Sequence, residues 1–313
     1  MKKFTIIFLS MPAVIFCSAL FVCAKADNSL YVEDFPQNAM INIFAERDFM
    51  TVVSIDFDGF APKTMESKSN ANDKIGIGAG YKSISFSYAF DITKRSKGIE
   101  AKSYDFQFYF FQKQWIIDAF YQYYRGHSKA YGMENFMQRW KGVELTRGGL
   151  SVQYVFNPNL SLEAAFKQTK LQKKSAGSFL LGASIYYNGF NLNFPEDIYD
   201  YGWASEDGHN WLIGPTIGYA YTAVFLKNFY FTGSMSMGIS FPFDNTTKSS
   251  LFWNFIPKFA LGYNADTWAL ILCFIYNYGI VDVDNYSENE LNPSNVNNTG
   301  RLTLSFTKRF DFF

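Results

Sequence analysis

Apolar and polar side chains alternate along many segments of this chain, at the length of about 9–11 residues that a membrane-spanning strand needs. Between residues 229 and 240, one face collects Phe229, Phe231, Met235, Met237 and Ile239, and the other Thr232, Ser234, Ser236, Gly238 and Ser240. The same alternation recurs at 104–110, 150–156, 160–167, 178–185, 268–274 and 302–306. A period of two predicts β-strands and not helices.

Strands of this kind must form a closed sheet. An unpaired backbone N–H or C=O in lipid costs several kcal/mol, and an open sheet would leave two such edges in the hydrocarbon. Aromatic residues make up 20% of the chain while its mean hydropathy is only −0.09, which is typical of a barrel with an apolar outside and a polar lumen. We therefore predict an all-β protein with a closed antiparallel transmembrane β-barrel.

The number of strands depends on the connections. Tight connections near residues 82–83, 112–114, 157–159, 226–228 and 264–266 alternate with long polar ones near 59–73, 93–101, 126–144, 195–208, 244–249 and 281–299. Short periplasmic turns and long external loops follow this order in outer-membrane barrels. Asn188-Gly189 is a strong hairpin signal, and a turn there gives about 14 strands; without that turn the alternative is 12.

A basic cluster precedes the predicted strand at 178–185. Lys170, Lys173 and Lys174 fall on an external loop or rim if the barrel has 14 strands. Such a rim would suit contact with lipid phosphates or an acidic ligand, although a short charge run is more often simply solvated.

The N-terminus has the pattern of a secretory signal peptide. Lys2 and Lys3 precede an apolar stretch that ends in Ala24-Lys25-Ala26, so residues 1–26 are expected to be cleaved; an uncleaved membrane helix is the alternative. We expect a periplasmic or lumen segment at 27–46 and an outer-membrane barrel at 47–313. The final RFDFF fits a signal for the barrel-assembly machinery, and lipid of the outer membrane would surround the strands.

Charge and cysteine content limit the possible functions. The chain has 28 basic and 28 acidic residues, and losing Lys2, Lys3 and Lys25 leaves 25 against 28. A mature charge of about −3 argues against nucleic-acid binding. Cys273 is alone after cleavage, so neither a disulfide framework nor a CxxC metal site is expected. No cofactor is implied.

Several segments also resemble a known family. The stretch QKKSAGSFLLG at Gln172–Gly182 is similar to the most distinctive segment of a family of uncharacterised outer-membrane-type barrels from Gram-negative bacteria. IGIGAGYKSISFSYAF at Ile75–Phe90, WIIDAFYQYYRG at Trp115–Gly126 and IGPTIGYAYT at Ile213–Thr222 extend the likeness over most of the mature chain. The family is a domain of unknown function, so the resemblance implies the fold and the outer membrane but no activity.

Five charged residues interrupt an inferred lumen face of small polar residues. They are Asp105, Asp118, Glu163, Lys167 and Lys258. They would either create a transverse field and a selective constriction, or pair with one another in a wet lumen. Pairing is the more ordinary outcome, since charges are common inside such barrels.

The leading functional hypothesis is a pore or transporter for small polar solutes, because barrels above about 8 strands have interior room. The alternative is a structural or surface-interaction barrel with a blocked lumen, acting through acidic loops at Asp197–Asp207 and Asp282–Asn298. A membrane lipid enzyme ranks last. His127 and His209 lack the neighbours of a catalytic triad or metal site, so we do not expect an enzyme.

Overall fold

The computed structural model describes residues 29–58, 61–69, 72–92, 102–131, 137–192, 206–242, 251–282 and 294–312 of the 313-residue chain. The expected signal peptide at 1–26 lies outside the described residues. So does most of the two acidic loop segments, at 193–205 and 283–293.

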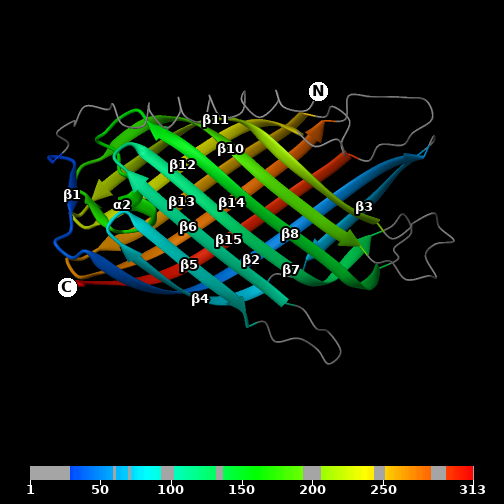
Figure 1. The fold of residues 1–313 in the computed structure, drawn as a ribbon, viewed down its shortest axis with the longest axis horizontal. Coiled ribbons are helices and arrows are strands. Elements are labelled where there is room, and N and C mark those ends of the chain that lie inside the picture. The colour runs from blue at the N-terminus through cyan, green and yellow to red at the C-terminus, as the bar shows by residue number, and fades with distance from the viewer. Residues whose placement is uncertain are drawn as a thin grey trace, which may run out of the picture.

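The described strands build one closed antiparallel barrel of twelve strands, tilted strongly to the barrel axis (Figure 1). In wall order these are β2 (Ala39–Asp58), β4 (Asn72–Tyr81), β5 (Ile84–Asp91), β6 (Lys102–Gln112), β7 (Trp115–Tyr131), β8 (Met137–Val155), β10 (Ala176–Leu192), β11 (Glu206–Phe225), β12 (Phe229–Pro242), β13 (Leu251–Asn264), β14 (Trp268–Asp282) and β15 (Ser294–Phe310). β15 pairs with β2 and closes the ring, so no edge of the wall is left unpaired. A further strand, β3 (Ala61–Ser69), extends the hairpin that begins with β2 and touches the end of β7.

The strand number is therefore the alternative of 12, and the expectation of about 14 is wrong. β10 runs without interruption through Asn188-Gly189. Asn188 pairs with Arg147 of β8 on one side and with Asn210 of β11 on the other. A turn at this point would break two ladders of hydrogen bonds, so pairing on both sides overrides the local turn preference.

The alternation of side chains matches the two faces of the wall. In β12, Phe229, Phe231 and Met235 are exposed on the outside, whereas Thr232 and Ser234 are buried on the inside. Apolar side chains on the outer face and polar ones in the lumen are the pattern of a membrane-spanning barrel. Among the described residues, no helix is both long and apolar enough to cross a membrane.

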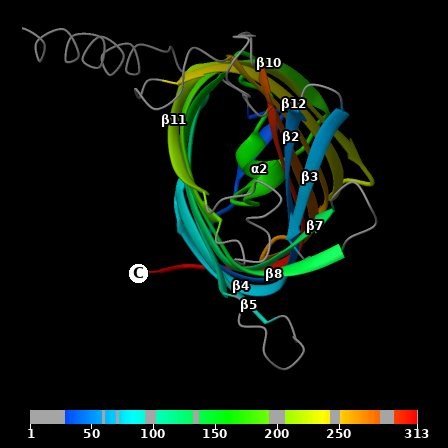
Figure 2. The same ribbon diagram turned by 90° about the vertical axis from the view of Figure 1, so that its right-hand side faces the viewer.

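The lumen is occupied at one end by the connection between β8 and β10 (Figure 2). This connection contains the short helix α2 (Leu162–Phe166) and the strand β9 (Lys170–Gln172), and β9 pairs with β1 (Val32–Asp34) from the N-terminal segment. We call residues 157–175 the plug. The plug and β1 lie together at the end of the barrel that carries the tight turns.

The helix in the plug corrects the expected strand at 160–167. The hydroxyl of Ser161 accepts a hydrogen bond of 3.1 Å from the backbone N–H of Ala164 and caps the helix. Leu162, Ala165 and Phe166 are spaced as one helical stripe, and they pack into two apolar clusters against the inside of the wall. The alternation in this segment was compatible with either structure, and burial in the lumen selects the helix.

The basic cluster lies at the end of the barrel opposite to the expected one. In the twelve-strand barrel the β8–β10 connection lies beside the tight turns, and not at the end with the long connections, where the 14-strand expectation placed Lys170, Lys173 and Lys174. Lys170 pairs with Asp34 at 3.0 Å and Lys173 with Glu33 at 3.3 Å. Lys174 lies over the ring of Tyr31, 5.5 Å from its centre. The cluster thus holds β1 against the plug.

The start of the wall also differs from the expected domain boundary. β2 begins at Ala39, so residues 39–46 belong to the barrel wall and not to a separate segment that ends at residue 46. The part of the N-terminal segment that contacts the plug is β1, at Val32–Asp34.

Candidate functional site

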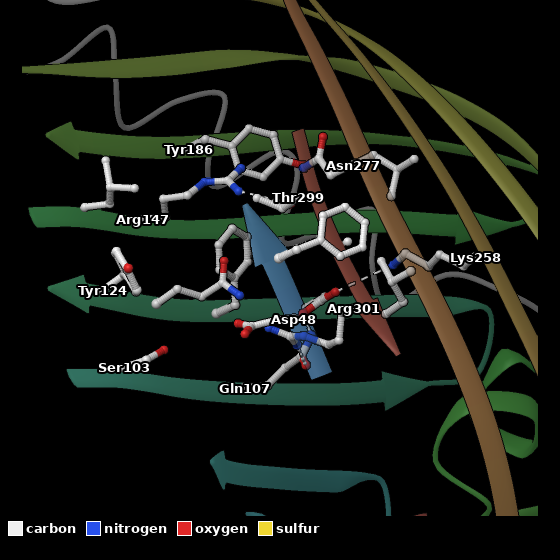
Figure 3. Close-up of a pocket in the computed structure, with 18 of the residues that line it drawn as sticks. Asp48, Ser103, Gln107, Tyr124, Arg147, Tyr186, Lys258, Asn277, Thr299 and Arg301 are labelled. Carbon is white, nitrogen blue, oxygen red and sulfur yellow. Dashed lines mark hydrogen bonds and ion pairs between the residues drawn. The ribbon is translucent and has the colours of Figure 1, made fainter. Parts of the chain in front are cut away.

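The lumen contains two polar cavities in line, one on each side of a layer of charged residues. The outer vestibule lies on the side of the long connections and includes Asp118, Arg147, Tyr186 and Lys258 in its lining (Figure 3). The inner chamber lies beneath it, and the plug residues Phe166, Lys167 and Gln168 form part of its boundary. Asp105 borders the inner chamber, while Gln107 and Arg301 border both cavities, so these residues mark the division.

An arginine from a distant wall strand reaches into the lumen at this division. Arg301 on β15 makes a charge-assisted contact with Asp105 on β6, four strands away around the ring. Its Nη1 also donates to Oε1 of Gln107 at 3.3 Å, and its Nε lies 3.4 Å from Oε1 of Glu46. The Asp105 side chain is 4% exposed and that of Arg301 15%, so the pair is shielded from water.

A buried lysine completes the layer. Nζ of Lys74 lies 2.6 Å from Asp48, 3.8 Å from Glu46 and 3.9 Å from Asp105. Oxygens of these three carboxylates lie within 4.8 Å of one another, a grouping that would suit a divalent cation. The cationic groups of Lys74 and Arg301 already lie among them, however, and would repel such an ion. The arrangement favours a charge-paired barrier over a metal site.

A second bridge spans the vestibule. Lys258 on β13 approaches Asp118 on β7 at 3.9 Å, and Nε2 of Gln107 lies 3.4 Å from the same carboxylate. The structure therefore brings together three of the five predicted lumen residues, Asp105, Asp118 and Lys258, in neighbouring cross-lumen contacts. Of these three, Asp118 and Lys258 pair with each other, whereas Asp105 pairs with Arg301 and Lys74, which the sequence analysis did not single out.

The other two predicted lumen residues belong to the plug and not to a wall strand. Glu163 accepts a 2.6 Å hydrogen bond from Thr169 and lies 3.6 Å from Nζ of Lys170. Burial raises the pKa of Glu163, although the charge of Lys170 opposes this shift. Burial by itself would lower the pKa of Lys170, but the carboxylates of Glu163 and Asp34 outweigh it and raise that pKa.

Lys167 has a different environment. Its ammonium group lies over the ring of Tyr109, 3.7 Å from the ring centre, at the inner surface of β6. Among the described residues, no carboxylate lies within ion-pair distance of it. Burial lowers its pKa to about 8, against a partial opposing effect of Asp118. The plug thus places a lysine that loses its proton more readily than usual against the floor of the inner chamber.

The plug is fastened to the wall by buried polar contacts. Nε of Arg309 donates to the carbonyl oxygen of Gln168 at 2.7 Å, and the Thr307 hydroxyl donates to the side chain of Gln168 at 2.9 Å. Tyr230 donates to the carbonyl oxygen of Ala165 at 2.8 Å. Gln172 ties the plug to itself, since its side chain accepts from the N–H of Ser161 at 2.8 Å and donates to Asn159 at 2.7 Å.

Sequence reasoning missed most of these partners. The missed residues are Glu46, Asp48, Lys74, Arg147, Arg301 and Arg309. Each places a charge on the inward phase of a strand, where small polar residues are otherwise common. The sequence showed this at Arg301, beside the outward Leu302. The sequence did not show which charges pair with which, because partners such as Arg301 and Asp105 are separated by 196 residues.

Residues 25–310 match the family described as "Domain of unknown function (DUF4421)". No curated protein matches the chain. Three solved structures are similar over most of their length. They are the outer membrane protease OmpT of Escherichia coli (10% identity, 88% of this chain and 98% of that chain, TM-score 0.37), the translocator domain of the autotransporter NalP from Neisseria meningitidis (9%, 97% and 95%, 0.41) and the P. putida toluene transporter TodX (6%, 89% and 91%, 0.31).

Proposed function

We propose that this chain, which belongs to the DUF4421 family of unknown function, is an outer-membrane channel or transporter for small polar solutes that is closed at rest. The observation that carries the proposal is the order of features along the lumen. An outer vestibule, a charged layer and an inner chamber follow one another, and the plug lies beneath them. A barrel that served only as a membrane anchor would need no such series of polar cavities.

Two barriers would have to move for a solute to pass. The first is the contact of Arg301 with Asp105, whose partners are on different strands of a rigid wall. Side-chain rotation alone could open it. The second is the plug, which is fixed through the backbone carbonyl of Gln168 and would have to move as a segment. Conduction therefore depends mainly on the plug.

The test is conductance of the purified, refolded chain in a planar bilayer, compared with a variant that lacks the plug. Asn157 donates to Ser178, and Phe156 to the carbonyl oxygen of Phe179, so the strands are still adjacent at residues 157 and 178. Replacing residues 158–177 by Asn-Gly would close them with a two-residue hairpin turn. We expect this variant to conduct in large, stable steps and the wild type to conduct rarely.

Correct folding of the variant can be established by its heat-modifiable mobility on a gel. A folded variant without added conductance would contradict the proposal, because the charged layer would then suffice to seal the lumen. A variant without the central ion pair of that layer, with Arg301→Gln and Asp105→Asn together, would show whether the charged layer is the remaining barrier.

A second candidate function is a permanently closed barrel that acts in structure or surface interaction. The fastening of the plug by Arg309, Thr307 and Tyr230 favours it, since buried polar contacts of this number resist release. Complete silence of the wild type under all voltages and solutes, with a conducting variant that lacks the plug, would support this alternative. Neither candidate involves catalysis.

A further inference from the structure

The outer vestibule contains one arginine whose charge is not matched by an acid. Arg147 on β8 points across the lumen toward β15, which lies six strands away on the opposite wall (Figure 3). Its Nη1 donates to the Thr299 hydroxyl and its Nε to the Asn188 side chain, each at 3.2 Å. Both partners are neutral. Among the described residues, no carboxylate lies within ion-pair distance of Arg147.

The other cations of the vestibule differ in this respect. Lys74 and Arg301 contact Asp48, Glu46 and Asp105, and Lys258 lies near Asp118. A guanidinium group has five N–H donors in a planar fork that fits a carboxylate or phosphate. Two of these donors on Arg147 are used by amide and hydroxyl oxygens, and its Nη2 has no partner among the described residues.

The surplus of positive charge is local to Arg147. The lining of the vestibule holds the basic residues Lys74, Arg147, Lys258 and Arg301 and the acidic residues Asp48 and Asp118. Glu46 and Asp105, at the border of the inner chamber, also contact Lys74 and Arg301, so that three of the four cations have acids beside them. In an enclosed site of low dielectric constant an anion is drawn to the cation whose charge is not matched, and that cation is Arg147.

An apolar surface lies beside this cation. Gly149 is two residues from Arg147 on the same inward face, and the rings of Phe120 and Tyr186 meet over it with their centres 6.1 Å apart. A Cβ atom at Gly149 would lie 2.4 Å from Phe120 and 2.7 Å from Tyr186, so a larger residue would force the rings away. A cation beside two rings suits a molecule with one anionic end and an apolar body.

We propose that the outer vestibule binds a small organic anion, with its carboxylate on Arg147 and its body against Tyr186 and Phe120. This inference rests on the proposed function and names the class of solute. Thr299 and Asn188 hold the guanidinium in place with neutral bonds, and a carboxylate would exchange the bond to Thr299 for a charge-assisted one. Such bonds are roughly twice as strong as neutral ones.

Binding can be measured separately from conduction by saturation-transfer NMR on the refolded chain in a zwitterionic detergent. The probe is benzoate, and benzamide is the neutral molecule of nearly the same shape. We expect transfer to benzoate and little to benzamide. Arg147→Gln should weaken benzoate binding about tenfold or more, because a hydrogen bond to a charged group is lost.

The matched control is Arg125→Gln, since Arg125 is an exposed arginine that pairs with Glu144 at 3.1 Å. It should leave benzoate binding unchanged, and inorganic phosphate should compete with benzoate on the wild type. Equal transfer to benzoate and benzamide, or equal binding by the wild type and Arg147→Gln, would overturn the proposal. A silent channel that still binds benzoate through Arg147 would refute transport and leave this site standing.

Discussion

The guanidinium group of Arg309 donates a 2.7 Å hydrogen bond to the carbonyl oxygen of Gln168 and so joins the last wall strand to the plug. Gln168 itself has a left-handed backbone conformation, with a φ of 60°. The remaining donors of Arg309 reach the side chain of Asn264 at 2.8 Å and the carbonyl oxygen of Ala265 at 2.7 Å. One side chain thus connects the C-terminal strand, the β13–β14 turn and the plug.

We expect Arg309→Lys to loosen the plug even though the charge is kept. A lysine cannot present the planar fork that reaches three acceptors at once. The free energy of unfolding in urea should fall by about 1.5–3 kcal/mol, the contribution of hydrogen bonds from a charged group. The frequency of open steps in a bilayer should rise. Arg47→Lys is the matched control, because Arg47 is exposed and only 3.8 Å from an exposed Asp73.

The position of Lys167 predicts that closure depends on pH. Its pKa is lowered to about 8 when the plug is docked, against an ordinary value of 10.5 when it is released. Between these values the released plug holds a proton that the docked plug has lost, so docking becomes more favourable as the pH rises from about 8 to about 10.5. Below pH 8 both forms are charged, and the cost of burying that charge is present in full.

Open steps should accordingly become rarer from pH 8 to pH 10.5 in the wild type. The variant Lys167→Met should lose this dependence, whereas Lys227→Met in an exposed turn should keep it. An unchanged pH profile in Lys167→Met would show that another group controls closure.

Removing one partner of the charged layer should destabilise the barrel. Arg301→Gln leaves the buried carboxylates of Asp105 and Glu46 without their main counter-charge, and such a loss costs about 3–5 kcal/mol. Adding Asp105→Asn should recover part of it, which a urea titration of both variants can establish. Arg125→Gln removes an exposed pair and should cost less than about 1 kcal/mol. Equal losses in the two single variants would contradict a buried, charge-paired layer.

The position of the basic cluster is testable in cells. In a background with Cys273→Ser, a cysteine at Lys173 should resist a membrane-impermeant thiol reagent in intact cells and react once the outer membrane is permeabilised. A cysteine in place of the exposed His209 should react in intact cells, because His209 lies at the start of β11, at the end of the barrel with the long connections. The reason is that tight turns face the periplasm in barrels of this kind. Labelling of Lys173→Cys in intact cells would reverse the orientation.

The sequence by itself determined the barrel. Phe231, Met235 and Met237 alternate with Thr232, Ser234 and Ser236 because each strand has lipid on one side and a polar lumen on the other. This requirement sets the polarity of each residue by the face on which it lies. The alternation is therefore visible in the sequence without the structure. The family resemblance carried by QKKSAGSFLLG pointed to the same fold.

Only the tertiary structure decided what fills the barrel. Leu160–Lys167 alternates well enough for a strand, but its apolar residues find their partners inside the lumen, and a helix presents them together. Asn188-Gly189 has the local chemistry of a turn, yet neighbours on both sides hold it extended. Arg301 meets Asp105, and Arg147 meets Thr299, only because the ring closes and its strands face one another across the lumen. These contacts join residues far apart in the chain, and no local pattern of residues encodes them.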